Sequence, residues 1–173
     1  EYYNQNNKVF IDGTLNVDFS ETQDKFLSFL KPGDKILDFG CGSGRDTKYF
    51  LEKGFEVTAI DGSKKMCEFA SQFTGINVTQ LDFLDFYEKE RYNGIWACSS
   101  ILHLNSKELL RVLKNISAAL KPDGIFYTSF KYGTFEGERN GRFFNDMTQT
   151  KFSELLKKIR FLEVLENWVT EDV

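Results

Sequence analysis

Hydrophobic and polar positions along the chain follow two alternating patterns from residue 34 onward. Short apolar runs are typical of buried parallel strands, and they predict strands at residues 36–39, 57–60, 78–81, 94–99, 125–130 and 162–169. Between these runs, apolar residues recur at helical spacing, which predicts helices near residues 45–53, 63–73, 106–120 and 151–160. Strands that alternate with helices imply right-handed crossovers in a parallel sheet. The pattern therefore predicts an α/β fold, a three-layer αβα sandwich with a mostly parallel sheet.

Several predicted elements carry their own boundary signals. Asn105 and Glu108 have the spacing of a capping box at the start of the helix over 106–120. Ser63 can cap the helix before it. The Lys-Pro-Asp-Gly sequence at residues 121–124 predicts a turn before the fifth strand.

The first strand runs directly into a glycine-rich turn, residues 40–44, and a helix opens at Arg45. Glycines at positions 40, 42 and 44 allow positive φ angles and a close approach of the backbone to a ligand. The amides at the start of the helix would point at that ligand. The second strand ends in Asp61, where an acid can bind both hydroxyls of a ribose. The alternative for Asp61 is a helix N-cap, and we favour ribose binding, hence a nucleoside ligand.

The glycine spacing distinguishes two cofactor classes. Dinucleotide-binding folds use G-x-G-x-x-G, and Arg45 occupies the position of the third glycine. The observed G-x-G-x-G, with Asp38 two residues before the first glycine, resembles motif I of the class I methyltransferases, which use S-adenosylmethionine. Residues 94–97, 102–104 and 121–124 are similar to later motifs of the same family. The resemblance covers nearly the whole chain and implies methyl transfer to a small-molecule acceptor within a Rossmann-like fold.

Two details refine this resemblance. Residues 44–47 and 129–133 are most similar to bacterial small-molecule methyltransferases, including the tellurite-resistance type. The family's sheet ends in an antiparallel hairpin of strands six and seven, whereas this chain ends just after the predicted sixth strand. We therefore expect the final antiparallel strand to be missing or replaced, which leaves an unpaired sheet edge.

The resemblance and the strand ends together assign the cofactor site. The expected cofactor-binding residues are Asp38, Gly40, Cys41, Gly42, Gly44, Arg45, Asp61, Gly62, Met66, Asp82, Phe83, Ala97 and Ser99. Asp38 would hold the turn and the methionine ammonium group. Arg45 would either pair with the methionine carboxylate or lie solvated on the first helical turn.

The adenine and the sulfur are expected at different strand ends. Gly62 and Met66 would flank the adenine ring, with the methionine giving a soft apolar contact. Asp82 would accept a hydrogen bond from the adenine amino group, with Asp85 as its competitor, and Phe83 would contact the ring. Residues 97–99, which include Cys98, would line the pocket near the sulfonium.

Candidate acceptor residues lie after the fourth and fifth strands. His103 is the only histidine; it is either a general base or a packing residue, and we favour packing because no acid partner is visible. The stretch 131–149 is expected to face the substrate, with Tyr132 and Arg142 suited to a small, anionic acceptor. Residues 1–24, which include Tyr2 and Tyr3, would form a lid over the cofactor or a frayed terminus.

The composition of the chain limits the classes of protein to which it can belong. The 173 residues fit one domain, and the 18 phenylalanines argue for a well-packed core. The net charge of −4, without a basic block, argues against a nucleic-acid partner.

No apolar run reaches membrane-spanning length, and no signal peptide is visible. Three cysteines without metal-ligand spacing indicate reduced thiols in a cytoplasmic protein and no metal site. Because the chain starts at Glu1, we expect a trimmed fragment.

Two other functions compete with methyl transfer by in-line displacement at the sulfonium methyl. A nicotinamide-dependent oxidoreductase would share the strand–glycine–helix pattern, but the chain has no Tyr-x-x-x-Lys pair after the fourth strand. A non-catalytic module that binds S-adenosylmethionine would share every cofactor motif. The sequence leaves open the acceptor, the atom methylated and the oligomeric state.

Overall fold

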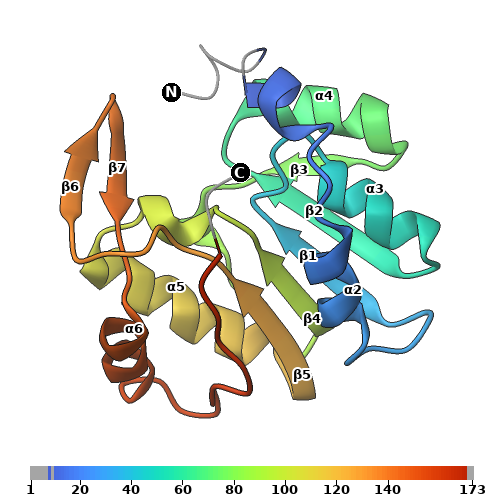
Figure 1. The fold of residues 1–173 in the computed structure, drawn as a ribbon. Coiled ribbons are helices and arrows are strands. Elements are labelled where there is room, and N and C mark those ends of the chain that lie inside the picture. Colours follow the sequence, from blue (N-terminus) through green and yellow to red (C-terminus); the bar gives the residue numbers. More distant parts are fainter. Residues whose placement is uncertain (1–7, 9, 171–173) are drawn as a thin grey trace.

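The computed structural model describes residues 8 and 10–170. Its centre is a five-stranded sheet in the order β3-β2-β1-β4-β5, in which every neighbouring pair is parallel. The strands are β1 (Lys35–Phe39), β2 (Glu56–Asp61), β3 (Val78–Gln80), β4 (Tyr92–Ala97) and β5 (Leu120–Thr128). Helices cover both faces of this sheet (Figure 1), which confirms the predicted α/β sandwich.

The helices divide into two layers. They are α2 (Ser20–Leu27), α3 (Arg45–Glu52), α4 (Lys64–Thr74), α5 (Ser106–Ala119) and α6 (Gln149–Leu156), with short 3-10 turns η1 (Phe83–Asp85) and η2 (Ile101–His103). Figure 1 shows α2, α3 and α4 on one face of the sheet, with α5 and α6 on the other. No helix in the described part of the chain is long and apolar enough to cross a bilayer.

Side-chain alternation along β1 and β4 explains this layering. Leu37 and Phe39 share a buried cluster with residues of α5, whereas Ile36 shares another with Phe26 of α2 and Trp96 of β4. Successive side chains of a strand point to opposite faces, so each strand contributes to both cores. The continuous apolar runs in the sequence are the consequence of this burial on both faces.

The predicted caps are present. Asn105 Oδ1 accepts hydrogen bonds from the amides of Lys107 and Glu108, and the Glu108 carboxylate accepts from the Asn105 amide, which completes the capping box. Ser63 Oγ accepts from the Met66 amide at the start of α4. These local signals fix where the two helices begin.

The region after α5 differs from the sequence pattern in two places. The predicted turn at residues 121–124 is a bulge inside β5, because the register with β4 jumps from Tyr92–Leu120 to Gly94–Ile125. Asp123 takes a positive φ of 62° within this bulge. The stretch 131–149, in which no strand was predicted, contains the antiparallel hairpin of β6 (Glu136–Arg139) and β7 (Arg142–Asn145).

The predicted strand at 162–169 is also wrong: the described residues from 162 to 170 form no strand. This segment is held by side chains instead, because Trp168 packs on Tyr127 at 6.1 Å between ring centroids and Glu166 Oε2 pairs with Lys25 Nζ at 2.5 Å. It therefore crosses the α2 face of the sheet (Figure 1) and leaves β5 as the edge strand among the described residues.

Candidate functional site

The glycine turn adopts a conformation that only glycine tolerates well. Gly40, Gly42 and Gly44 have φ angles of 87°, 53° and 81°. The amides of Gly40 and Cys41 donate to the Ile60 carbonyl at 2.9 and 3.0 Å, which holds the turn beside the end of β2. A Cβ atom on Gly40 would lie 2.4 Å from the Ser100 Cβ. The turn therefore requires both positive φ and the absence of a side chain.

Asp61 connects the glycine turn to the start of α4. Its carboxylate accepts hydrogen bonds from the backbone amides of Gly42 at 3.0 Å and Ser63 at 2.8 Å. Burial raises the pKa of Asp61, while these two backbone hydrogen bonds act in the opposite direction. Ser63 rather than Asp61 provides the side-chain cap of α4. The acid thus stands at the carboxyl end of β2, where a ribose is bound in doubly wound folds.

Asp38 lies beneath the turn, on the buried side. Only 2% of the residue is exposed, and its Oδ2 accepts a hydrogen bond of 2.5 Å from the Thr47 hydroxyl. Burial, and then the nearby charge of Asp46, raise the pKa of Asp38 well above its usual range. Asp38 therefore ties the end of β1 to the first turn of α3.

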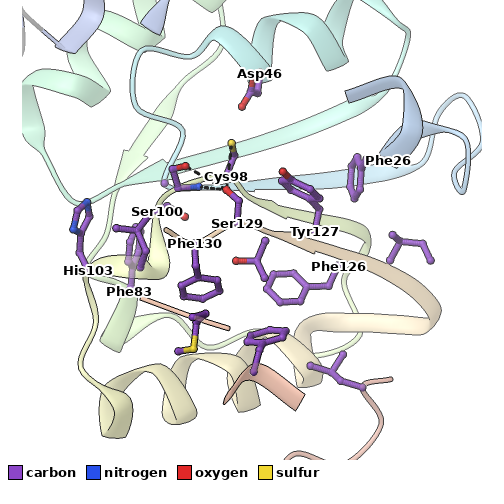
Figure 2. Close-up of a pocket in the computed structure, with 18 of the residues that line it drawn as sticks. Phe26, Asp46, Phe83, Cys98, Ser100, His103, Phe126, Tyr127, Ser129 and Phe130 are labelled. Atoms are coloured by element: carbon purple, nitrogen blue, oxygen red, sulfur yellow. Dashed lines mark hydrogen bonds between the residues drawn. The ribbon is translucent and has the colours of Figure 1, made fainter. Parts of the chain in front are cut away.

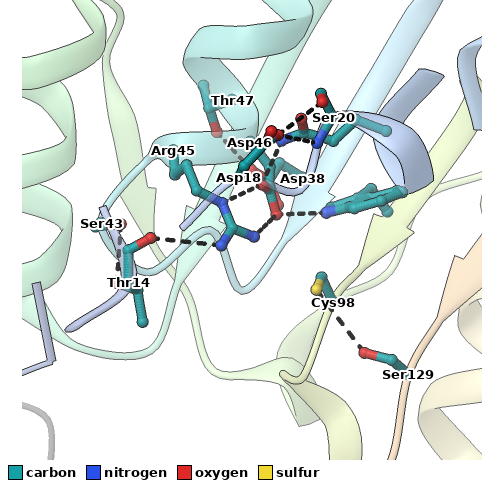
Figure 3. Close-up of polar contacts among 12 residues, drawn as sticks. Thr14, Asp18, Ser20, Asp38, Ser43, Arg45, Asp46, Thr47, Cys98 and Ser129 are labelled. Atoms are coloured by element: carbon teal, nitrogen blue, oxygen red, sulfur yellow. Dashed lines mark hydrogen bonds and ion pairs between the residues drawn. The ribbon is translucent and has the colours of Figure 1, made fainter. Parts of the chain in front are cut away.

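The Arg45 side chain is hydrogen-bonded within the protein and does not extend into solvent. Its Nε and Nη2 donate to the two carboxylate oxygens of Asp46 at 2.7 and 3.1 Å (Figure 3). Asp46 also accepts hydrogen bonds from Gln23 Nε2 and Trp96 Nε1, at 2.7 and 2.8 Å. Sequence reasoning missed Asp46, because Gln23 and Trp96 are far from it in the chain.

Three small residues that follow β4 line the cavity, and one of them has a strained backbone. Ser99 has a φ of 50°, and its amide donates to Ser129 Oγ at 2.8 Å. Cys98 and Ser100 line the same cavity (Figure 2). Ala97 is fully buried in the core on the α5 side and does not line the cavity.

On the side expected for adenine, Asp82 lines the cavity and Asp85 does not. Asp82 is exposed and caps η1 by accepting from the Leu84 amide at 2.9 Å. Phe83 stacks on Phe39 at 4.6 Å between ring centroids, and Met66 is 1% exposed beside the turn. Gly62 also lines this part of the cavity.

The β6–β7 hairpin lies against His103. The Nδ1 atom of His103 is 2.7 Å from the Phe143 carbonyl oxygen, and the ring contacts Phe144 edge-on at 4.9 Å. Because a carbonyl only accepts, Nδ1 carries the proton in the neutral ring. Burial lowers the pKa of His103, and the nearby charge of Arg142 adds to this effect.

Aromatic rings and arginines form the outer wall of the cavity. Tyr132 is 65% exposed, and the Arg142 guanidinium lies 5.0 Å from the centre of the Phe144 ring. The Arg139 guanidinium also lies 5.0 Å from the centre of the Phe144 ring, and it pairs with Asp146. All five residues line the cavity that contains the glycine turn.

The N-terminal segment reaches the turn through Thr14. Its hydroxyl lies 3.4 Å from Ser43 Oγ, and its carbonyl accepts from Arg45 Nη1 at 3.4 Å. Phe10 and Thr14 line the cavity, whereas Tyr2 and Tyr3 lie outside the described residues.

The cysteines of this region are suited to packing. Burial is the main cause that raises the pKa of the Cys41, Cys67 and Cys98 thiols, so they stay protonated at neutral pH. Thiols in this state are poor nucleophiles.

The donor set fits a nucleoside cofactor of the S-adenosylmethionine type. The turn has glycine at three of its five positions and lies beside the Asp61 carboxylate, which can accept hydrogen bonds from ribose hydroxyls. The Arg45 guanidinium lines the same cavity and can pair with a carboxylate. Arg45 occupies the position of the third glycine of a dinucleotide-binding turn, and its side chain lines the cavity. This difference disfavours a dinucleotide.

Comparisons with known proteins agree with this geometry. A family described as a methyltransferase domain matches residues 36–124, more than half of the 173 residues. A putative methyltransferase of Bacillus subtilis, YqeM, is 36% identical over 109 residues, which are 56% of this chain and 44% of the relative. Phosphoethanolamine N-methyltransferase 1 of Zea mays is 33% identical over 126 residues, 68% of this chain and 25% of the relative. The chain thus spans about half or less of these two relatives.

Solved structures agree on the fold. The 1,6-didemethyltoxoflavin-N1-methyltransferase of Burkholderia thailandensis, crystallised with its substrate and S-adenosylhomocysteine, superposes with a TM-score of 0.71 at 24% identity, covering 90% of this chain and 72% of that one. A TehB-like methyltransferase of Corynebacterium glutamicum gives 0.70 at 21% identity, covering 91% and 80%. Together with the family match and the glycine turn, these findings establish that the chain belongs to the class I S-adenosylmethionine-dependent methyltransferases.

Proposed function

We propose that this chain transfers a methyl group from S-adenosylmethionine to a small-molecule acceptor held between the end of β4 and the β6–β7 hairpin. One observation carries the proposal: the glycine turn and Asp61 line one side of a cavity whose other side includes His103 and the hairpin. Bound S-adenosylmethionine supplies a methyl group on a positively charged sulfur. The protein therefore has mainly to align acceptor and cofactor, which can lower a barrier by roughly 7–11 kcal/mol in well-oriented cases.

Residues at the ends of different strands bind different parts of the cofactor. Asp61 binds the ribose hydroxyls, and Asp38 braces the turn from below through Thr47. Arg45 receives the carboxylate of the methionine part, for which its planar guanidinium is well suited. Adenine contacts come from Gly62, Met66, Asp82 and Phe83, and Ser99 lies toward the sulfur.

The acceptor side carries positive charge and aromatic surface. Arg139, Arg142 and Tyr132 all line the cavity, and Arg142 favours an anionic acceptor. The Zea mays relative is named for phosphoethanolamine, which carries an anionic phosphate, and this supports the same acceptor class. We assign Arg142 and Tyr132 to the acceptor and residues 131–149 to its enclosure.

His103 serves here as a support for the hairpin. Its protonated Nδ1 is committed to the Phe143 carbonyl, so the ring positions β7 against η2. An acceptor that arrives with a lone pair already free needs no general base.

The segment from Phe10 to residue 24 covers the glycine turn. Thr14 connects it to the turn, because the Thr14 hydroxyl contacts Ser43 Oγ and the Thr14 carbonyl accepts a hydrogen bond from Arg45.

Two measurements, made one after the other, test the proposed function. Calorimetry should detect binding of S-adenosylhomocysteine and no comparable binding of NAD. Turnover should then appear on a panel of small acceptors, with phosphorylated and carboxylated members ahead of neutral ones. Preferred binding of NAD would refute the cofactor assignment. Tight binding of S-adenosylhomocysteine without turnover on any acceptor would indicate the non-catalytic module.

A further inference from the structure

We propose that Asp46 is a positioning residue, which holds the guanidinium of Arg45 so that its outer N–H groups face the cavity and bind the amino-acid carboxylate of the cofactor. The inference rests on the proposed function, because it uses the assignment of Arg45 to that carboxylate. It adds a residue whose carboxylate is occupied by donors of the protein and which acts through its neighbour.

The carboxylate of Asp46 is fully engaged. Each of its oxygens accepts two hydrogen bonds: Oδ1 from Arg45 Nε and Gln23 Nε2, and Oδ2 from Arg45 Nη2 and Trp96 Nε1, all within 3.1 Å. A carboxylate has about four such acceptor positions. Because the donors belong to α2, α3 and β4, three separate elements fix the orientation of this one group.

Burial makes this orientation rigid. Asp46 is 8% exposed and Gln23 is 2% exposed, while the Trp96 ring is fully buried. The Trp96 ring is itself clamped by Phe26 at 5.1 Å, Phe50 at 5.3 Å and Tyr127 at 4.1 Å between ring centroids. The carboxylate is thus held by a donor that cannot move without disturbing the core.

Arg45 is oriented by this anchor. Adjacent residues of a helix do not face one another by default, yet Arg45 turns its Nε and Nη2 edge onto Asp46, and the Phe19 ring lies 5.0 Å from the guanidinium carbon. Three of its five N–H groups are engaged, the third with the Thr14 carbonyl. The edge formed by Nη1 and Nη2 faces away from Asp46 (Figure 3), and Arg45 lines the cavity. A ligand carboxylate can bind that edge in a two-point geometry.

A purely structural role for Asp46 predicts something different. If Asp46 only joins α2, α3 and β4, its loss weakens every nucleoside ligand alike through a general loosening of the site. If it positions Arg45, its loss weakens only ligands that carry the amino-acid carboxylate. S-adenosylhomocysteine has that carboxylate, and 5′-methylthioadenosine shares the nucleoside but lacks it.

The experiment is therefore calorimetric titration of both ligands into the wild-type chain, Asp46→Asn, Arg45→Ala and the double variant. Asparagine keeps the shape of the side chain but offers an N–H group toward one of the donors. We expect Asp46→Asn to weaken S-adenosylhomocysteine by about tenfold or more, the scale of a hydrogen bond to a charged group. Binding of 5′-methylthioadenosine should stay within about twofold, and Asp46→Asn should add little in the Arg45→Ala background.

Asp24→Asn is the matched control. Asp24 is an exposed acid of α2 that binds Tyr49 and does not line the cavity, so both affinities should be unchanged. Equal losses for both ligands in folded Asp46→Asn, no loss, or a gain in affinity would overturn the proposal. If Asp46→Asn does not fold, Arg45→Lys replaces it, because lysine cannot bind a carboxylate at two points; an unchanged ratio of the two affinities would then refute the role. Failure of the wild-type chain to bind either ligand would instead refute the proposed function.

Discussion

The carboxylate of Asp61 accepts a hydrogen bond from the Gly42 amide at 3.0 Å, so the acid that ends β2 also holds the glycine turn that follows β1. The second oxygen of the same carboxylate accepts from the Ser63 amide. One side chain therefore shapes the turn and lines the cavity. Any test of its ligand role has to separate these two effects.

Substituting Asp61 should weaken the cofactor site. We expect Asp61→Ala to reduce the binding of S-adenosylhomocysteine by about 1.5–3 kcal/mol, because a charged hydrogen-bond acceptor is lost. Asp61→Asn should lose less, since its amide oxygen can still accept from one of the two backbone amides. Calorimetry gives the affinities, and Asp85→Asn, outside the cavity, is the control. Unchanged affinity in folded Asp61→Ala would show that the ribose is bound elsewhere.

A side chain at Gly40 should destabilise the chain more than one at Gly54. Both glycines have a φ of 87°, but a Cβ on Gly40 would meet Ser100 at 2.4 Å, whereas one on Gly54 would meet nothing within 4 Å. We expect Gly54→Ala to cost about 1–2 kcal/mol for the positive φ alone. Gly40→Ala should cost about 1–3 kcal/mol more from the steric clash. Urea unfolding measures both, and equal costs would contradict the tight contact.

Removing His103 should affect stability more than chemistry. His103→Ala loses the hydrogen bond to Phe143 and the contact with Phe144, which together are worth about 1–2 kcal/mol. Turnover of the folded variant should stay within a few-fold of the wild type. A loss of roughly 10²–10⁴ in turnover at normal stability would identify His103 as a general base instead.

Arg142 should govern the preference for anionic acceptors. We expect Arg142→Ala to raise KM for an anionic acceptor by about tenfold or more, the scale of one charge-assisted hydrogen bond, while neutral acceptors change little. Arg91→Ala, at a residue that does not line the cavity, controls for the general loss of a positive charge. If Arg142→Ala keeps its rate and KM on every acceptor, Arg142 has no part in acceptor binding.

Stability should fall as the pH rises through the titration of Asp38. Its raised pKa means that the folded chain holds this proton more tightly than the unfolded chain. The resulting stabilisation is complete below the ordinary carboxyl pKa of about 4, and it is lost as the pH rises from there through the folded-state pKa. Asp38→Asn, which keeps an acceptor for Thr47, should flatten this decline. Urea unfolding between about pH 5 and pH 8 checks it; equal slopes would mean that Asp38 is ionised in the folded chain.

The sequence by itself determined the elements that depend on local physics. β1 and β4 are apolar runs because they are buried on both faces. The start of α5 was predictable because Asn105 and Glu108 satisfy its amides within one turn. The glycine turn was predictable because few residues other than glycine tolerate its φ angles.

Tertiary structure decided the features that need a distant partner. Residues 162–169 have an apolar strand pattern, but a strand also needs a neighbour to pair with, and here Trp168 packs on Tyr127 instead. The β6–β7 hairpin is polar on its exposed positions, so its periodicity was weak. Asp46 gained its role only when the fold brought Gln23 and Trp96 to it. Hydrogen bonds across such sequence distances leave no local pattern, whereas burial and backbone geometry do.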